Sequence, residues 1–151
     1  MIYAISIYKD KKDVLLLLPT AKTEAGFSIE INKPIIIEKP YTNIAVGEKV
    51  KECLDISRKE PVQPIHHINE VVKVFEIVTG IKSYSKFSKE RLSMEVFMDT
   101  EKGYTIMPLV RHSDGSYRPS KERYPEIKMD LSATSEQIGK AITDTFQALQ
   151  K

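Results

Sequence analysis

Two hydrophobic periods follow one another in the second half of this chain, and together they restrict its fold. Apolar and polar side chains alternate over residues 92–99 and again over 126–131, which is the period of half-buried strands. From residue 134 onwards the period changes to that of a helix with one apolar face. Elements in this order require a sheet with a face that the helix can cover.

The first alternating segment predicts one arm of a hairpin. The residues DTEKG after it are typical of a turn, and Tyr104 to Val110 follows as the second arm. A last strand is predicted near residues 127–131. The first arm alternates Leu92, Met94, Val96 and Met98 with Ser93, Glu95, Phe97 and Asp99.

The C-terminal helix has the clearest boundaries in the sequence. Thr134 and Gln137 have the spacing of a capping box, and Glu136 suits the positive end of the helix dipole. Gly139 costs such a helix about 1 kcal/mol relative to alanine, so we expect it to mark a close approach to a neighbouring strand. The apolar face consists of Ile138, Ala141, Ile142, Phe146 and Leu149.

The first half of the chain adds shorter patterns. Apolar residues at helical spacing predict an amphipathic helix from Asn43 to about Leu54, with Cys53 on its buried face. The segment 69–80 fits a helix ending at Gly80, and its β-branched residues would suit a strand equally; we predict the helix. Strands are predicted at residues 2–8, at 14–18 with an end at Pro19, at 27–31, and at a sheet edge over 35–37.

These patterns predict an α+β fold. We expect one domain over residues 1–151, built as a mostly antiparallel sheet with about three helices packed on it, including the C-terminal amphipathic helix. A chain of 151 residues is long enough to bury a core without disulfides or a metal.

Composition indicates an ordinary soluble protein. Acidic and basic residues are intermixed and the net charge is +2, so nucleic acid is not the expected partner. The single cysteine suits a reducing compartment. The N-terminus lacks the pattern of a signal peptide, and the longest apolar run, Val14 to Leu18, is too short to cross a membrane. We therefore expect a cytoplasmic protein.

No motif of an enzyme, a metal site or a cofactor site is present. His66 and His67 are adjacent and His112 is distant, so no metal-ligand spacing occurs. The sequence His112, Ser113, Asp114 indicates a turn, because adjacent side chains cannot converge as a catalytic triad. No phosphate-binding glycine loop occurs. Paired carboxylates leave no fixed spacing and stay open as a possibility.

The segment from Lys82 to Arg91 mixes aromatic and basic residues, which supports an alternative function as a small RNA-binding module. The competing interpretation is structural. Ile81, Tyr84 and Phe87 would then be core anchors and the lysines their solvated face, which we favour.

The same region carries a resemblance to a known family. The residues GIKSYSKFSKE, RLSMEVFMD, YTIMPLV with Pro108, and LSATSEQIGKAITDTFQAL resemble the C-terminal half of CdiI-type immunity proteins of contact-dependent growth inhibition. The resemblance covers residues 79–149 and not the first 60. It implies a cytoplasmic, non-enzymatic protein that binds and neutralises the C-terminal domain of a cognate toxin, often a nuclease.

Nuclease active sites are commonly basic, so an inhibitor that occludes one should offer carboxylates and aromatic anchors. The stretch between residues 99 and 126 is rich in loops and supplies both. Its candidate toxin-binding residues are Asp99, Glu101, Asp114, Tyr117, Glu122 and Glu126. For any single one of them, an ordinary surface charge or turn residue is the competing interpretation. The oligomeric state is left open.

Overall fold

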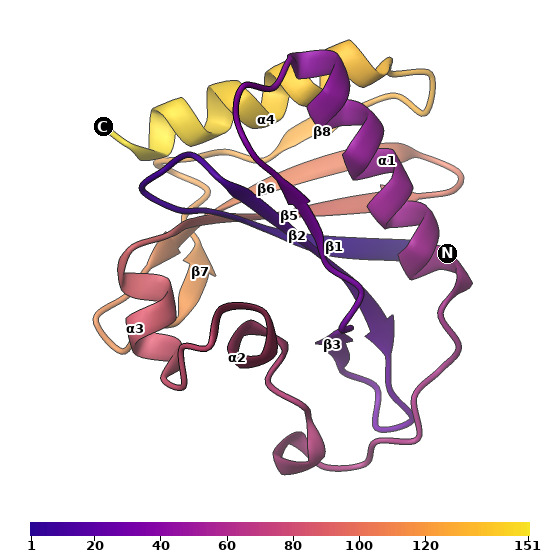
Figure 1. Cartoon of the computed structure of the whole chain (residues 1–151). Helices are drawn as coiled ribbons and strands as arrows, with labels where there is room; N and C mark the ends of the chain where they lie inside the picture. The colour runs from indigo at the N-terminus through magenta and orange to yellow at the C-terminus, as the bar shows by residue number, and fades with distance from the viewer.

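The computed structural model describes residues 1–151 and centres on an eight-stranded sheet (Figure 1). The strand order is β3-β2-β1-β5-β6-β7, with β4 also pairing with β2 and β8 with β6, and all these pairs are antiparallel. The predicted α+β fold is confirmed. The strands are β1 (Ile2–Lys9), β2 (Leu15–Lys22), β3 (Ser28–Glu30), β4 (Ile35–Ile37), β5 (Leu92–Asp99), β6 (Gly103–Arg111), β7 (Tyr117–Pro119) and β8 (Ile127–Met129).

The predicted hairpin lies beside β1 in the sheet. It joins β5 to β6, with Val96 opposite Ile106 and Asp99 opposite Gly103. The other edge of β5 pairs along the whole length of β1. The two halves of the chain therefore meet in one sheet.

Strand β2 continues through Pro19, where a strand end was expected. The Pro19 carbonyl accepts the Ile31 N–H at 2.8 Å on the β3 side. The N and C=O of a strand residue point to the same side, so the missing N–H also faces that side. There β2 changes partner, from β4 at residues 15–17 to β3 at residues 20–22. The proline therefore interrupts no hydrogen bond with β1.

Two long helices lie side by side over one face of the sheet (Figure 1). They are α1 (Asn43–Lys59), which the Thr42 side chain caps, and α4 (Ser135–Leu149), which begins with the predicted capping box. Gly139 marks a close approach to α1 rather than to a strand, because a Cβ at Gly139 would overlap the Asn43 carbonyl. The prediction of a strand as its neighbour was wrong.

The core between these helices and the sheet is the larger of two. Residues from β1, β2, β4, β5 and β6 meet the apolar faces of α1 and α4 there. The predicted face of α4 contributes its three most buried members. The largest fully buried side chains of this core are Phe146, Ile5, Ile7, Leu15, Leu17, Leu54, Met94, Ile106, Ile138 and Ile142.

A smaller core lies on the opposite face of the sheet, under α2 (Val74–Thr79) and α3 (Tyr84–Lys89). The predicted helix over residues 69–80 is shorter than expected. A 3-10 turn occupies Ile68–Glu70, and α2 follows and ends at Gly80 with a φ of 75°. The β-branched run between them disfavours a helix through residue 71. This core consists of Tyr8, Leu16, Leu18, Val74, Phe75 and Phe87.

Candidate functional site

Helices α2 and α3 cover only part of the second face of the sheet. Directly opposite strand residues point to the same face, so the register identifies what lies beside the smaller core. Ser6 stands opposite Glu95, which stands opposite Met107, and Ala4, Phe97 and Thr105 form the next row. All of these side chains are partly exposed. We call this surface the open face; it comprises Ala4, Ser6, Thr20, Lys22, Glu30, Glu95, Phe97, Thr105 and Met107.

Two carboxylates lie along the boundary between the covered and the open parts of this face. Glu30 comes from β3, and its Oε2 accepts a hydrogen bond from the Tyr8 hydroxyl at 2.7 Å. The Tyr8 hydroxyl also lies 3.5 Å from that of Tyr84 on α3. Glu95 comes from β5. Neither Glu30 nor Glu95 forms a salt bridge.

Burial perturbs both carboxylates. Loss of solvent raises the pKa of Glu30, and hydrogen bonds from Tyr8 and Ser6 offset part of that increase. Loss of solvent also raises the pKa of Glu95, and the nearby negative charge of Glu30 raises it further. Both effects disfavour the ionised form. The pair is therefore a poorly compensated negative charge that a cation would stabilise.

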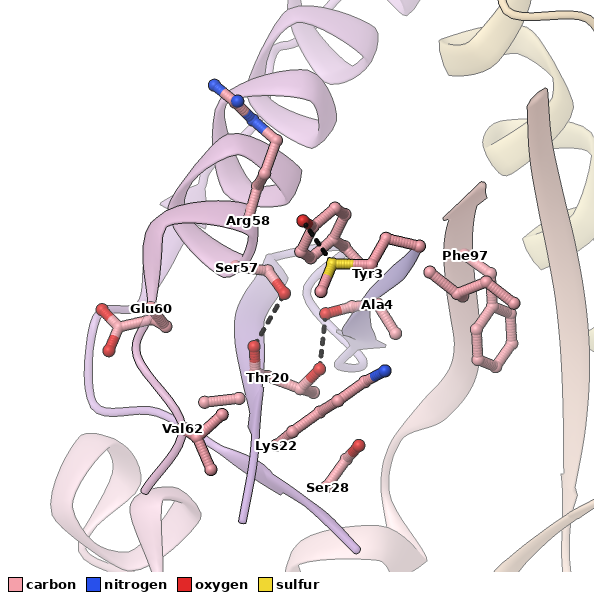
Figure 2. A pocket seen from close by; sticks show the side chains of 13 residues that line it. Tyr3, Ala4, Thr20, Lys22, Ser28, Ser57, Arg58, Glu60, Val62 and Phe97 are labelled. Carbon is pink, nitrogen blue, oxygen red and sulfur yellow. Dashed lines mark hydrogen bonds between the residues drawn. The ribbon is translucent and has the colours of Figure 1, made fainter. Parts of the chain in front are cut away.

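Phe97 lies between two hollows. One is a pocket of about 280 Å³ where β1 and β2 separate beyond the pair Ile5 and Pro19 (Figure 2). There the Ser57 hydroxyl donates to the Thr20 carbonyl and the Thr20 hydroxyl to the Ala4 carbonyl, both at 2.7 Å.

The second hollow, of about 350 Å³, lies on the other side of Phe97. It reaches the turn between β5 and β6, and its charged lining residues are Asp99, Lys102, Glu126 and Lys128. The Lys128 ammonium lies 3.7 Å from the Glu126 carboxylate. An aromatic side chain between two hollows on an open sheet face has the environment of an interface anchor.

The candidate toxin-binding residues lie at different places along β6. Asp99 and Glu101 lie at the turn before β6, and Asp99 lines the same hollow as Glu126. Asp114 and Tyr117 lie beyond the opposite end of the strand. Glu122 is exposed in the loop before β8. The structure therefore brings only part of the set together.

Several of these side chains have local structural partners. The Tyr117 hydroxyl lies 3.0 Å from the Ser88 carbonyl and 2.8 Å from that of Arg91, positioned to donate to either. Hydrogen bonds from Ser116 lower the pKa of Asp114 to about 2, with a further contribution from Arg118. The Asp99 carboxylate accepts the N–H of Glu101, which lowers its pKa. These contacts stabilise turns.

The basic and aromatic segment contains α3. Phe87 is fully buried and Tyr84 partly buried, whereas Lys82, Lys86 and Lys89 are exposed, as the structural interpretation predicts. Arg91 was grouped with the lysines but packs differently. Its guanidinium lies 4.4 Å from the centre of the Phe87 ring and donates to the Phe87 carbonyl at 3.0 Å.

The residues considered for metal or thiol chemistry lie apart. His66 and His67 are exposed, and His66 contacts Glu24 at 3.2 Å. No three His, Cys, Asp or Glu side chains gather as a metal-binding group. Cys53 is buried as predicted, and burial raises its pKa to about 12. None of the helices combines the length and apolar character needed to cross a lipid bilayer.

The open face was not predicted from the sequence. Glu95 and Phe97 both stood on the polar side of the alternating strand 92–99. An aromatic residue on that side is the one signal that the face is not simply solvated. Glu30 gave no signal, since its place depends on the pairing of β3 with β2.

Comparison with known proteins identifies the fold. No protein-family model and no curated protein matches the sequence. The chain is similar in structure to a chain of the CdiA-CT/CdiI toxin and immunity complex from Yersinia pseudotuberculosis, at 14% identity and a TM-score of 0.71, over 98% of this chain and 97% of the other. It is also similar to a protein of unknown function from Neisseria meningitidis, at 13% identity and a TM-score of 0.70, over 97% and 94%.

Proposed function

We propose that this chain is an immunity protein that binds and neutralises the C-terminal toxin domain of a cognate contact-dependent growth inhibition system. The observation that carries the proposal is the match in fold, over nearly the full length of both chains, to a chain of a toxin and immunity complex. The resemblance of residues 79–149 to CdiI-type proteins points the same way. Binding, rather than catalysis, is the proposed activity, and the proposed compartment is the bacterial cytoplasm.

We propose that the toxin is a nuclease, as the resemblance to CdiI-type proteins implies. A nuclease holds phosphates and offers a basic site that carboxylates complement. Asp99 and Glu126 line the hollow beside Phe97 and, with Glu101 of the adjoining turn, are our first proposed contacts. Asp114, Tyr117 and Glu122 form a second proposed group at a different place.

The decisive experiment uses the toxin domain encoded beside this gene, carrying an inactivating substitution. Calorimetry should show binding at nanomolar or tighter affinity, which corresponds to about −12 kcal/mol or stronger. Coexpression with the active toxin should protect the cells. Absence of binding by the cognate pair would contradict the proposal.

Charge reversal separates the two groups of proposed contacts. Glu101→Lys and Glu126→Lys should weaken binding of the toxin: a rim carboxylate lost from a contact with a basic surface slows association, and a buried one speeds dissociation. Glu122→Lys serves as the comparison from the second group. Asp99 and Asp114 are less suitable first choices, since both stabilise turns and their variants also change local structure.

A further inference from the structure

We infer that the open face is the docking surface for the toxin, and that Glu30 and Glu95 receive a lysine or arginine side chain of the toxin there. This inference rests on the proposed function and names the surface and the chemistry of its occupant. It is independent of the resemblance in sequence, since Glu30 lies outside the matching residues.

The helices of this chain leave part of the sheet uncovered. Helices α1 and α4 close one face, and α2 and α3 close part of the other. The open face continues the same strands with half-buried side chains, and a hollow of about 350 Å³ lies beside Phe97. The pocket of about 280 Å³, which Ser57 and Arg58 of α1 also line, reaches Phe97 from the end of β1 and β2. A partner that lies across this face would bury Phe97 at the centre of the contact, where hot spots concentrate.

The charge of Glu30 and Glu95 favours a cationic side chain as their partner. Glu30 receives hydrogen bonds only from neutral hydroxyl groups, and Glu95 has no hydrogen-bond partner or salt bridge among the side chains around it. Lys22 lies on the same face, but no basic side chain pairs with either carboxylate in the free protein. A guanidinium or ammonium placed between the two carboxylates would form charge-assisted hydrogen bonds, which are shorter and stronger than neutral ones.

A second copy of this chain is disfavoured as the occupant. A two-fold contact through the open face would place the same patch of each copy together. If its axis passed close to Glu30 and Glu95, these carboxylates would face those of the other copy, and like charges brought together in a desolvated contact repel. A basic partner would compensate the negative charge of Glu30 and Glu95, whereas a second copy would bring more negative charge to the contact.

The experiment compares near-isosteric neutral variants. Glu30→Gln, Glu95→Gln and the double variant are measured for dissociation of the inactivated toxin domain from the neighbouring gene. Each single variant should weaken binding by about 30-fold or more, mostly through faster dissociation. Phe97→Ala should weaken binding by a similar factor. Circular dichroism and size-exclusion chromatography confirm that each variant is folded and report self-association.

The matched control is Glu48→Gln, which removes a carboxylate on the exposed side of α1, away from the open face. It should bind like the parent. If the parent binds and the folded Glu30, Glu95 and Phe97 variants bind equally well, the inference is overturned and the proposed function stands. If only Phe97→Ala weakens binding, the assignment of a cation to the carboxylates is wrong. If the parent itself does not bind, both fail.

Discussion

Gly47 of α1 and Gly139 of α4 set the closest approach of the two long helices. A Cβ on Gly47 would overlap the carbonyl oxygen of Ser135, and a Cβ on Gly139 would overlap that of Asn43. Each glycine thus accommodates the first residues of the other helix. This reciprocal contact fixes how α1 and α4 share one face of the sheet.

The first prediction concerns these glycines. Alanine is about 1 kcal/mol better than glycine within a helix. Gly47→Ala and Gly139→Ala should nevertheless destabilise the protein by about 1 to 3 kcal/mol, because the added methyl group meets backbone atoms that cannot move independently. Urea unfolding measures the change. Gln147→Ala, on the exposed side of α4, is the control and should be close to neutral; stabilisation by either glycine variant would refute the close contact.

A second prediction separates structure from binding at Tyr117. Its hydroxyl contacts the carbonyls of Ser88 and Arg91 from within the smaller core region. Tyr117→Phe leaves these acceptors without that donor and should lower the free energy of unfolding by about 0.5 to 1.5 kcal/mol. Because the hydroxyl is directed at these two carbonyls, the proposed toxin contact of Tyr117 is made by its ring, and toxin dissociation should not change. Faster dissociation at unaltered stability would instead make the Tyr117 hydroxyl itself a contact.

Individual helices and strands were predicted from the sequence better than the contacts between them. The alternation over 92–99 and the capping box at Thr134 depend on residues close in sequence, and both are confirmed. Gly139 was read correctly as a close contact, but its partner, α1, lies about ninety residues away and local patterns do not encode it. A proline ends many strands. At Pro19, however, the missing N–H falls where β2 changes its partner from β4 to β3.

The open face, too, could not be predicted from local sequence patterns. Its row of side chains is assembled from β1, β3, β5 and β6, so it exists only once the pairing is known. The acidic loop residues were chosen from charge and expected exposure. The structure separates them along β6, because the turns on either side of a strand point to opposite ends of the sheet.

A third prediction tests the RNA-binding alternative. Replacing Lys82, Lys86 and Lys89 by Gln should leave stability nearly unchanged, since all three are exposed. If these lysines are only a solvated face, neither the parent nor the variant should bind RNA specifically at physiological salt. Submicromolar binding by the parent that falls steeply with salt, and is lost in the variant, would favour the alternative.

Arg91→Gln provides the contrast within that segment. Its guanidinium packs on the Phe87 ring and donates to the Phe87 carbonyl. Loss of these contacts should destabilise the protein by about 1 kcal/mol. A combined variant that included Arg91 would therefore confuse a folding defect with loss of binding.

The last prediction concerns the effect of Glu95 on stability. Burial and the charge of Glu30 raise its pKa in the folded protein, so the folded state binds a proton more readily than the unfolded state does. Between the two pKa values, stability therefore falls as pH rises. The titratable groups near this pair are the two carboxylates themselves, Tyr8 and Tyr84.

Glu95→Gln should accordingly make the free protein more stable at pH 7, by about 0.2 to 1 kcal/mol, the scale of cross-strand charge interactions. The gain should shrink as pH falls through the raised pKa and vanish below the unfolded value of about 4.3, where the parent carboxyl is protonated in both states. Urea unfolding of the parent, this variant and Glu48→Gln at pH 7 and pH 5 measures it. A variant that is more stable alone but releases the toxin faster would show that Glu95 serves binding at the expense of folding. A variant that is less stable at pH 7 would mean that the carboxylate already has a stabilising partner within the chain, which removes the reason for assigning it a cation from the toxin.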